Sequence, residues 1–354
     1  MKLDLLNGTT IIDFTRLLPG PVATNLLAQM GAKVIKIESP KRMDYARSIG
    51  KQIHGASMLF HQLNHNKELV MIDYSSPAGK NELIDLIKEA DVLIEQFRPG
   101  AMSAWGLGYK EVRAINSKII YVSFTGYGQT GAYASEAGHD LNFLAYSGIM
   151  SLQKDENGKP IVSDTQFADI SGAYMTIIAI QAALLKRSRT ATGSFVDVSM
   201  CDAVLPFLTI PYALHCGGQD YSLHNTVNGK TAVNYACYEC ADGKWLAVAA
   251  MELKFWNNLC HVLNKSEWKR RHQKDLMNTN FPKAEVESHF KTKTRDEWIE
   301  LLTGKDVCTS PILDIEELEN SSYHQERNSF EEIVVSKDLN FKTVRLPFRI
   351  RNSK

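Results

Sequence analysis

The sequence predicts an α/β protein with a Rossmann-like parallel-sheet large domain and a smaller α+β domain. In the first half of the chain, short β-rich runs alternate with helical patterns, which is typical of βαβ units on a parallel sheet. From about residue 225 to 318 the pattern changes to aromatic-rich strands, such as 245–248, mixed with charged helices at 266–274 and 295–302. This change of pattern predicts a second domain.

The order of the elements follows from these runs. The β-rich run 10–14 is followed by Pro21, which favours the start of a helix, and Gly31 favours its end. Further strands are predicted at 34–37, 69–72, 92–94, 119–122 and 195–198. Further helices are predicted at 82–90, after Pro99, at 169–186 and through Ala213.

A turn-rich segment, 216–220, predicts where the large domain ends. We expect a large Rossmann-like domain over residues 1–215, a small α+β domain over 216–318, and a C-terminal return over 319–354 that packs on the large domain. The first turn of the expected sheet lacks the Gly-x-Gly-x-x-Gly pattern that holds a dinucleotide pyrophosphate. The sequence therefore gives no support to NAD binding.

Charge and composition narrow the class of protein. The 354 residues carry 40 basic and 40 acidic side chains, so no global field attracts nucleic acid or an anionic membrane surface. No run approaches the roughly 20 consecutive apolar residues that cross a bilayer, and the first residues lack a signal-peptide pattern. We expect a cytoplasmic protein that binds neither nucleic acid nor membrane. Of the six cysteines, the close pair Cys237 and Cys240 makes only half a zinc site, so no metal is expected.

Two residues at predicted helix starts are suited to proton transfer. His139 stands between Gly138 and Asp140 just before an apolar helical pattern, and Asp140 can cap that helix. Asp169 opens the long apolar helix. Each is also common as a structural residue at such a position, either as a hydrogen-bonding histidine or as an N-cap aspartate. Together they predict a site that stabilises negative charge developing beside a carbonyl group.

A carboxylate and several basic residues extend the candidate site. Glu252 follows the apolar run 245–248 of the small domain, where it either orients an imidazole across a cleft or is a surface carboxylate. Arg98 lies just past the strand 92–94, at the edge where parallel sheets bind ligands. Four more basic residues are expected to cluster at that edge and to suit phosphates: Lys36, Lys41, Arg42 and Lys67.

Seven groups of residues carry a resemblance that extends over nearly the whole chain. They are 13–14 with 18–21, 27–34, 90–95 with 97–100, 126–131, 138–142, 249–252 and 306–311. Together they resemble the class III CoA-transferase family (CaiB/BaiF type), and most closely its α-methylacyl-CoA racemase branch. The resemblance implies a Rossmann-like large domain built from both chain ends, a small domain, and an interlocked homodimer. It also implies an acyl-CoA substrate and no cofactor beyond the coenzyme A of that substrate.

The same resemblance implies roles for the candidate residues. Asp169 falls on the catalytic aspartate that the family shares, and His139 falls on a histidine that many transferases replace by tyrosine. The two would be bases on opposite faces of the α-carbon of a 2-methylacyl thioester, with Glu252 paired to His139. One base removes the α-proton while the other returns a proton to the opposite face. The backbone amide of Asp140 is the candidate donor to the enolate oxygen.

Racemisation or epimerisation of an acyl-CoA is thus the first functional prediction. The alternative within the family is a CoA-transferase that moves CoA between an acyl-CoA and a carboxylic acid, in which Asp169 forms an acyl-aspartyl anhydride. A third reading is a CoA-binding protein without activity. It is suggested by Ser39 and by Lys67-Glu68, which stand where the racemase branch has arginine and a Lys-Arg pair.

Overall fold

The structure is a computed structural model that describes residues 4–155, 157–218, 232–270, 283–336 and 339–350. The chain forms two compact units. The large unit consists of residues 1–208 and 328–354, and the small unit consists of residues 209–327. The small unit is therefore an insertion in the sequence of the large one.

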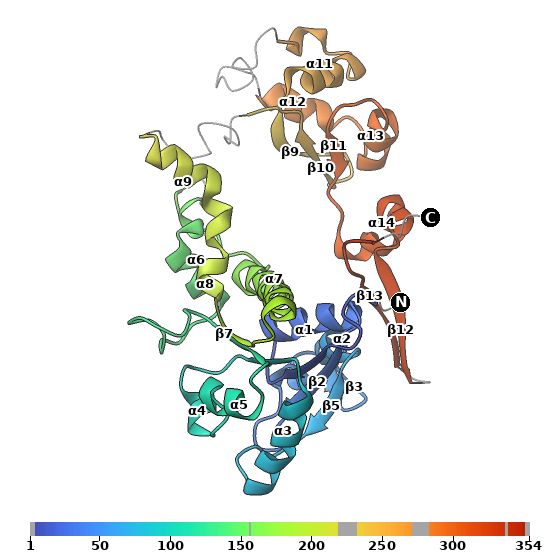
Figure 1. Cartoon of the computed structure of the whole chain (residues 1–354). Coiled ribbons are helices and arrows are strands. Elements are labelled where there is room, and N and C mark those ends of the chain that lie inside the picture. Colours follow the sequence, from blue (N-terminus) through green and yellow to red (C-terminus); the bar gives the residue numbers. More distant parts are fainter. Residues whose placement is uncertain (1–3, 156, 219–231, 271–282, 337–338, 351–354) are drawn as a thin grey trace. The chain divides into compact units, whose positions relative to one another are not determined.

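Six parallel strands form the central sheet of the large unit (Figure 1). They are β1 (Thr10–Asp13), β2 (Lys33–Glu38), β5 (Glu68–Met71), β6 (Val92–Glu95), β7 (Ile120–Thr125) and β8 (Ser194–Ser199). Their order is β5-β2-β1-β6-β7-β8, and every neighbouring pair is parallel. The order reverses between β1 and β6, and parallel sheets bind ligands beyond the carboxyl ends of their strands at such a point.

Helices cover both faces of this sheet. On one face lie α1 (Pro19–Gln29), α7 (Phe167–Thr190) and α8 (Met200–Ala203), whose apolar side chains share a core with Val92 and Val122. On the other face lie α3 (Pro77–Glu89), α4 (Ala101–Ala104) and α5 (Tyr109–Ile115), which share a core with Leu93 and Tyr121. Successive residues of a strand point to opposite faces, so neighbouring residues of β6 belong to different cores.

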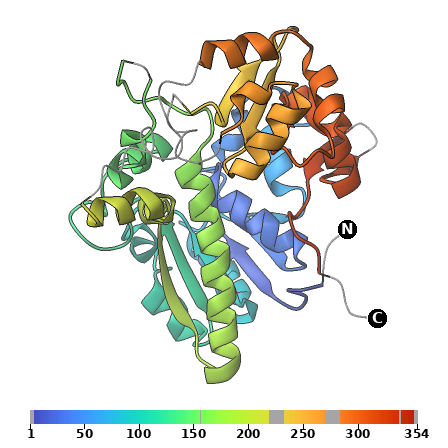
Figure 2. The same cartoon turned by 90° about the horizontal axis from the view of Figure 1, so that it is seen from above.

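The helix α7 is long and apolar enough, by length and composition, to cross a membrane. In the large unit it runs along the sheet (Figure 2), with Ala173, Ile177 and Ile180 buried in the core. About 44% of its most apolar window is buried. Core helices pass the same test of length and composition, so the test alone is weak evidence for a membrane span.

Shorter elements complete the large unit. They are η1 (Tyr45–Ser48), β3 (Gln52–Ile53), β4 (Ala56–Ser57), α2 (Met58–Asn64), α6 (Asp140–Ser147), η2 (Ile149–Ser151) and η3 (Leu205–Leu208). The last segment is a hairpin of β12 (Phe330–Ser336) and β13 (Leu339–Val344). It returns to α2, where Gln62 Nε2 donates to the Lys342 carbonyl at 2.7 Å. The hairpin thus belongs to the large unit, although it follows the small unit in the sequence.

The small unit has its own sheet and core. Its antiparallel strands are β9 (Tyr235–Glu239), β10 (Trp245–Ala249) and β11 (Thr309–Pro311), with β10 in the centre. Its helices are α9 (Thr209–Cys216), α11 (Leu253–Val262), η4 (Ser266–Trp268), α12 (Lys283–Phe290), α13 (Arg295–Leu302), η6 (Ile315–Asn320) and α14 (Ser322–Arg327). Three buried tryptophans fill the core: Trp256, Trp268 and Trp298. The indole N–H groups of Trp256 and Trp298 donate to backbone carbonyls.

The α/β class with a parallel sheet and a smaller α+β part is confirmed, but the unit boundaries differ from those expected. The large unit ends at 208 rather than 215, and α9 buries only Pro211. The return begins at 328 rather than 319, because Glu317 pairs with Arg295 and Lys244 at 2.7 Å and keeps η6 on the small unit. The helix expected at 266–274 is a 3₁₀ turn at 266–268, and residues 271–274 lie outside the described residues.

Candidate active site

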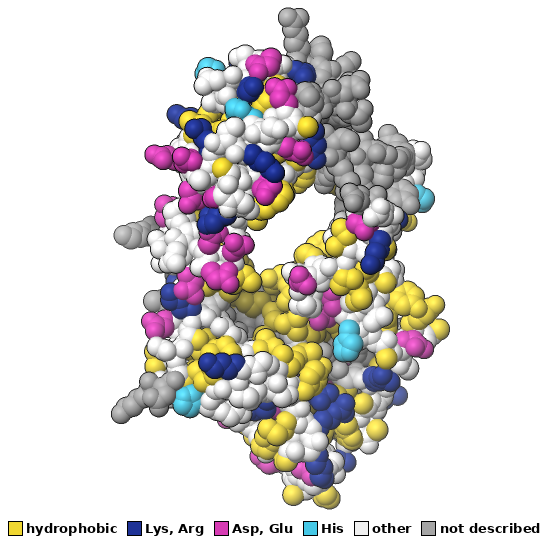
Figure 3. All heavy atoms as spheres, turned by 180° about the vertical axis from the view of Figure 1, so that it is seen from behind, with side chains coloured by type: hydrophobic (Ala, Val, Ile, Leu, Met, Phe, Trp, Pro, Cys, Tyr) yellow, Lys and Arg dark blue, Asp and Glu magenta, His cyan; other side chains and the backbone are white. Residues whose placement is uncertain are grey.

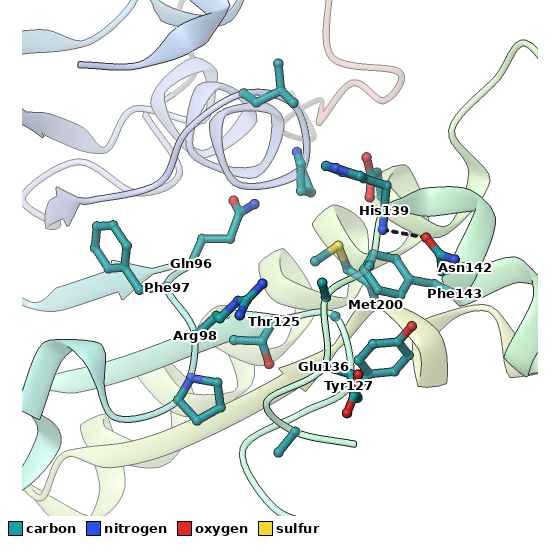
Figure 4. Close-up of a pocket in the computed structure, with 18 of the residues that line it drawn as sticks. Gln96, Phe97, Arg98, Thr125, Tyr127, Glu136, His139, Asn142, Phe143 and Met200 are labelled. Atoms are coloured by element: carbon teal, nitrogen blue, oxygen red, sulfur yellow. Dashed lines mark hydrogen bonds between the residues drawn. The ribbon is translucent and has the colours of Figure 1, made fainter. Parts of the chain in front are cut away.

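A cavity of about 380 Å³ lies at the carboxyl ends of β1, β6 and β7, where the strand order reverses. Loops that follow these strands line it, together with the starts of α6, α7 and α8. Figure 4 shows Gln96 and Arg98 reaching into the cavity from the loop after β6, and His139 from the opposite side. The volume and the mixed polar and apolar lining are typical of a small-molecule site.

The cavity brings together His139 and Asp169, the two candidate bases. His139 is the last residue before α6, and Asp169 lies in the first turn of α7. Unsatisfied amide groups at helix starts carry partial positive charge, so anionic intermediates are stabilised there. The cavity therefore holds an imidazole and a carboxylate where an enolate or an acyl intermediate would be stabilised.

Two glycines set the approach of α6 to the cavity. A Cβ atom on Gly138 would lie 2.7 Å from the Phe143 ring, and one on Gly126 would lie 2.5 Å from the same ring. The backbone N–H of His139 donates to Asn142 Oδ1 at 3.1 Å, which ties the residue before the helix to its first turn. Close packing of glycine on Phe143 thus fixes where the His139 backbone enters the site.

Asp140 joins the two helices that carry the candidate bases. The sequence suggested that it caps α6, but its Oδ1 accepts hydrogen bonds from the N–H groups of Ala168 at 2.7 Å and Asp169 at 3.1 Å, at the start of α7. The carboxylate therefore caps the neighbouring helix, which is a correction. The Asp140 N–H, the expected oxyanion donor, makes no hydrogen bond within the part of the chain that the structure describes.

The environment of Asp169 favours the protonated carboxyl group. Burial, followed by repulsion from Asp140, raises the pKa of Asp169 to about 7. A carboxyl group with a pKa near neutrality exists in both protonation states at physiological pH, so it can accept and return a proton. Asp169 is therefore suited to serve as a catalytic base and acid.

Two of the predicted phosphate ligands are internal ion-pair partners instead. Lys36 and Lys67 are buried, with 0% and 9% of their surface exposed. Lys36 Nζ lies 2.9 Å from Asp44 Oδ2, and Lys67 Nζ lies 3.2 Å from Asp13 Oδ2. A charge removed from water requires such a partner, and neither ammonium group reaches the surface. The prediction that these two lysines bind phosphate is therefore corrected.

The other predicted basic residues remain accessible. Arg98 is exposed and lines the cavity. Lys41 is exposed and its Nζ lies 2.8 Å from Asp73 Oδ2, so part of its charge is balanced. Arg42 is exposed and is the last residue of a turn that its N–H closes by donating to the Ser39 carbonyl at 2.9 Å. Arg98 and Arg42 thus keep charged groups near the carboxyl edge of the sheet.

Sequence reasoning missed Arg16, which lies three residues after the end of β1 and directly after the buried Thr15. The Arg16 guanidinium carbon lies 5.6 Å from the centre of the Phe97 ring, and that of Arg42 lies 5.3 Å from the same centre. Burial, followed by the charge of Arg42, lowers the pKa of Arg16. Within the described residues neither guanidinium forms an ion pair. Because Phe97 lines the cavity, this arginine pair is suited to hold a polyanion beside it.

Tyr45 is a second residue that the sequence did not single out. It is the first residue of η1, lines the cavity and lies under the Arg16 guanidinium, 5.7 Å from ring centre to Cζ. Its pKa is raised by burial first, with Asp169 among the further causes. The sequence around Tyr45 has no helical or strand periodicity that would have indicated its place at the cavity.

Glu252 belongs to the small unit, where it is exposed and precedes α11 as its N-cap residue. Its carboxylate does not cap the helix. Its pairing with His139, a residue of the large unit, stays a prediction. Among the described residues, no group of three or more His, Cys, Asp or Glu side chains is placed to hold a metal ion.

The comparisons with known proteins agree over almost the whole chain. The sequence model described as CoA-transferase family III matches residues 6–354. Human alpha-methylacyl-CoA racemase is 30% identical over 332 residues, which cover 92% of this chain and 82% of the racemase. The acetyl-CoA:oxalate CoA-transferase of Acetobacter aceti is 30% identical over 331 residues, which cover 91% of this chain and 84% of the transferase.

The chain is also similar over its whole length to a solved structure of the CAIB/BAIF family. A crystal structure of a CAIB/BAIF family protein from Brucella suis superimposes with a TM-score of 0.85 at 27% sequence identity. The match covers 100% of this chain and 94% of the Brucella suis chain.

Proposed function

Because the chain belongs to CoA-transferase family III, whose racemase and CoA-transferase members are its relatives, we propose that it is an acyl-CoA racemase or epimerase. In this proposal the enzyme inverts the α-carbon of a 2-methylacyl-CoA by transfer of protons between two bases. The observation that carries the proposal is that His139 and Asp169 line one cavity at the starts of two helices.

The proposed mechanism uses the two bases in turn. One base removes the α-proton and leaves a planar enolate, and the conjugate acid of the other delivers a proton to the opposite face. The pKa of about 7 lets Asp169 act in either direction. The unpaired Asp140 N–H is the proposed donor to the enolate oxygen. The proposed mechanism uses no metal or organic cofactor, and in it Glu252 is the residue that orients His139.

The coenzyme A portion requires a cationic surface. We assign its phosphates to Arg16 and Arg42, which lie over Phe97 beside the cavity, and to Arg98, which lines it. Arg42 and Arg98 are exposed, and Arg16 is partly exposed. Guanidinium groups bind phosphate oxygens in pairs, and they do so best where no carboxylate competes for them. Lys41 adds positive charge at the rim of the same edge.

The experiment is incubation with (R)-2-methylacyl-CoA in deuterium oxide. We expect deuterium at the α-carbon together with the (S)-isomer. In a two-base mechanism, Asp169→Asn and His139→Gln should each abolish inversion. The remaining base still exchanges the α-proton of one enantiomer for deuterium without inverting it. The two variants should therefore show this exchange for opposite enantiomers. Asp164→Asn, an exposed carboxylate near the start of α7, is the control and retains both activities. Absence of both deuterium and the (S)-isomer with the wild-type enzyme would refute the proposal.

Transfer of CoA is the second candidate, and the similarity to the Acetobacter aceti transferase favours it. In that reaction an Asp169 oxygen attacks the thioester carbonyl, the C–S bond breaks, CoA leaves as the thiolate and an acyl-aspartyl anhydride forms. The acceptor carboxylate then attacks the acyl carbonyl of this anhydride and frees Asp169, and the CoA thiolate attacks the acceptor's carbonyl carbon, which forms the new acyl-CoA and releases the donor acid as its carboxylate. Hydroxylamine added during turnover distinguishes the two, because only the anhydride yields a modified Asp169 that mass spectrometry detects.

We also propose that the enzyme is a homodimer in the cytoplasm. On α7, Tyr174, Ile178 and Leu185 are 47%, 54% and 56% exposed and share one face of the helix. Figure 3 shows hydrophobic side chains gathered on one face of the large unit as well. Apolar area of this kind marks an interface. Light scattering tests the dimer: Ile178→Asp should give a monomer, while Ile315→Asp, at a position 82% exposed on the small unit, should not.

A further inference from the structure

We propose that the buried ion pair of Lys36 and Asp44 positions one wall of the active-site cavity and, with it, the phosphate-binding Arg16. The inference rests on the proposed function, because it assigns the pair to the binding of acyl-CoA rather than to proton transfer. Neither side chain touches the cavity. They act through Leu17 and Tyr45, which line it.

Lys36 holds the start of this wall. It lies on β2 with its side chain fully buried, and its Nζ donates to the Thr15 carbonyl at 2.6 Å. The same Nζ lies 2.9 Å from Asp44 Oδ2. Thr15 immediately precedes Arg16, so the lysine anchors the backbone on one side of the arginine.

Asp44 holds the other side of Arg16 and the next wall segment. Its Oδ1 accepts from the N–H of Leu17 at 3.0 Å and from the N–H of Ala46 at 2.9 Å. Leu17 follows Arg16 and Ala46 follows Tyr45. One carboxylate therefore joins two segments that are distant in sequence, and each contributes a side chain to the cavity.

The backbone of Leu17 explains why such an anchor is needed. Its φ angle is +59°, in the left-handed region that leucine rarely adopts. Strained backbone of this kind persists where surrounding contacts determine it, and it is common at ligand sites. Without the acceptor on Asp44, the loop 15–19 would relax towards ordinary angles and move Arg16 away from Phe97.

A second buried lysine offers a matched comparison. Lys67 is also fully buried at its side chain, and its Nζ contacts Asp13 Oδ2 at 3.2 Å and the Pro21 carbonyl at 3.1 Å. Neither Asp13 nor Pro21 lines the cavity. Asp13 also accepts from the Thr15 N–H, at 2.8 Å, but it does so through Oδ1, which Lys67 does not contact. Loss of Lys67 therefore disturbs an ion pair of similar burial while the Asp44 bonds to Leu17 and Ala46 stay in place.

The experiment compares Lys36→Met, Asp44→Asn and Lys67→Met. For the acyl-CoA reaction, we expect the first two variants to raise KM about tenfold or more with kcat reduced less than threefold. Lys67→Met should lower the melting temperature as much as Lys36→Met while its KM stays within twofold of wild type. Calorimetry of free CoA binding is measured in parallel. It reports on the wall even if neither racemisation nor transfer is found, so the two proposals fail separately.

A double variant separates positioning from general loss of stability. If Lys36 acts through Arg16, then Lys36→Met combined with Arg16→Ala should bind CoA no more weakly than Arg16→Ala alone, within twofold. If Lys36→Met does not fold, Asp44→Asn, which preserves shape, replaces it in the same cycle. Multiplicative effects in the cycle, or an equal rise of KM in Lys36→Met and Lys67→Met, would overturn the inference.

Discussion

Replacement of Asp169 by asparagine should abolish inversion and stabilise the protein at neutral and alkaline pH. The pKa of the carboxyl group is about 7 in the folded protein, against 3.8 for the ordinary group. Because the folded state binds the proton more tightly than the unfolded state, wild-type stability falls as pH rises from about 4 to 7. At about 1.4 kcal/mol per pH unit, the full shift corresponds to about 4 kcal/mol as an upper limit. Partial exposure of the group reduces this, and we expect about 2–4 kcal/mol.

Urea denaturation from pH 3.5 to 8.5 measures the effect, since asparagine has nearly the same shape and no titration. The difference in unfolding free energy between Asp169→Asn and wild type should be smallest at pH 3.5, increase through pH 5 and 6, and become constant above pH 7. Asp164→Asn should show no such increase, because Asp164 is exposed. If Asp169→Asn were no more stable than wild type at pH 8, the carboxyl group would not be strained by burial and repulsion.

Three further predictions follow from the same site. Asp140→Asn removes the negative charge that, after burial, helps to raise the pKa of Asp169, so the low-pH limb of the kcat/KM profile should move to lower pH, and an unchanged limb contradicts this. Gly138→Ala places a Cβ 2.7 Å from the Phe143 ring, so it should lower the free energy of unfolding by about 1–3 kcal/mol, measured by thermal unfolding, and should lower kcat. Unchanged stability and kcat would show that the ring moves aside without cost. Arg16→Ala should weaken CoA binding about tenfold by calorimetry, with a smaller salt dependence than wild type; loss of affinity without that change would contradict a phosphate contact.

The sheet and the positions of the two candidate bases at helix starts were predictable because their signals are local. The runs 10–14, 34–37 and 92–94 are short, apolar and separated by helical patterns, and each is a strand of the parallel sheet. His139 and Asp169 precede or open strongly apolar helical patterns, and both helices form where expected. That the two residues line one cavity depends on sheet order, which local patterns do not specify.

The roles of the basic residues depended on burial, and here the sequence misled. Lys36 sits within Val34-Ile35-Lys36-Ile37, and a strand in the middle of a parallel sheet is covered on both faces. That rule could have predicted an internal partner instead of a phosphate. Arg16 carried the opposite signal, since it follows β1 at the carboxyl edge of the sheet. Its pairing with Arg42 comes from a turn whose geometry the sequence does not reveal.

The return of the chain to the large unit has a consequence for how the protein is made. All six strands of the parallel sheet lie before residue 200, whereas the hairpin β12–β13 that contacts α2 is synthesised after the whole small unit. On the ribosome, the sheet can assemble while α2 still lacks its covering hairpin. The docking of β12 and β13 on α2 can then follow synthesis of the small unit, and substitution of Gln62, whose contact forms late, should mainly speed undocking of the hairpin and leave assembly of the sheet unchanged.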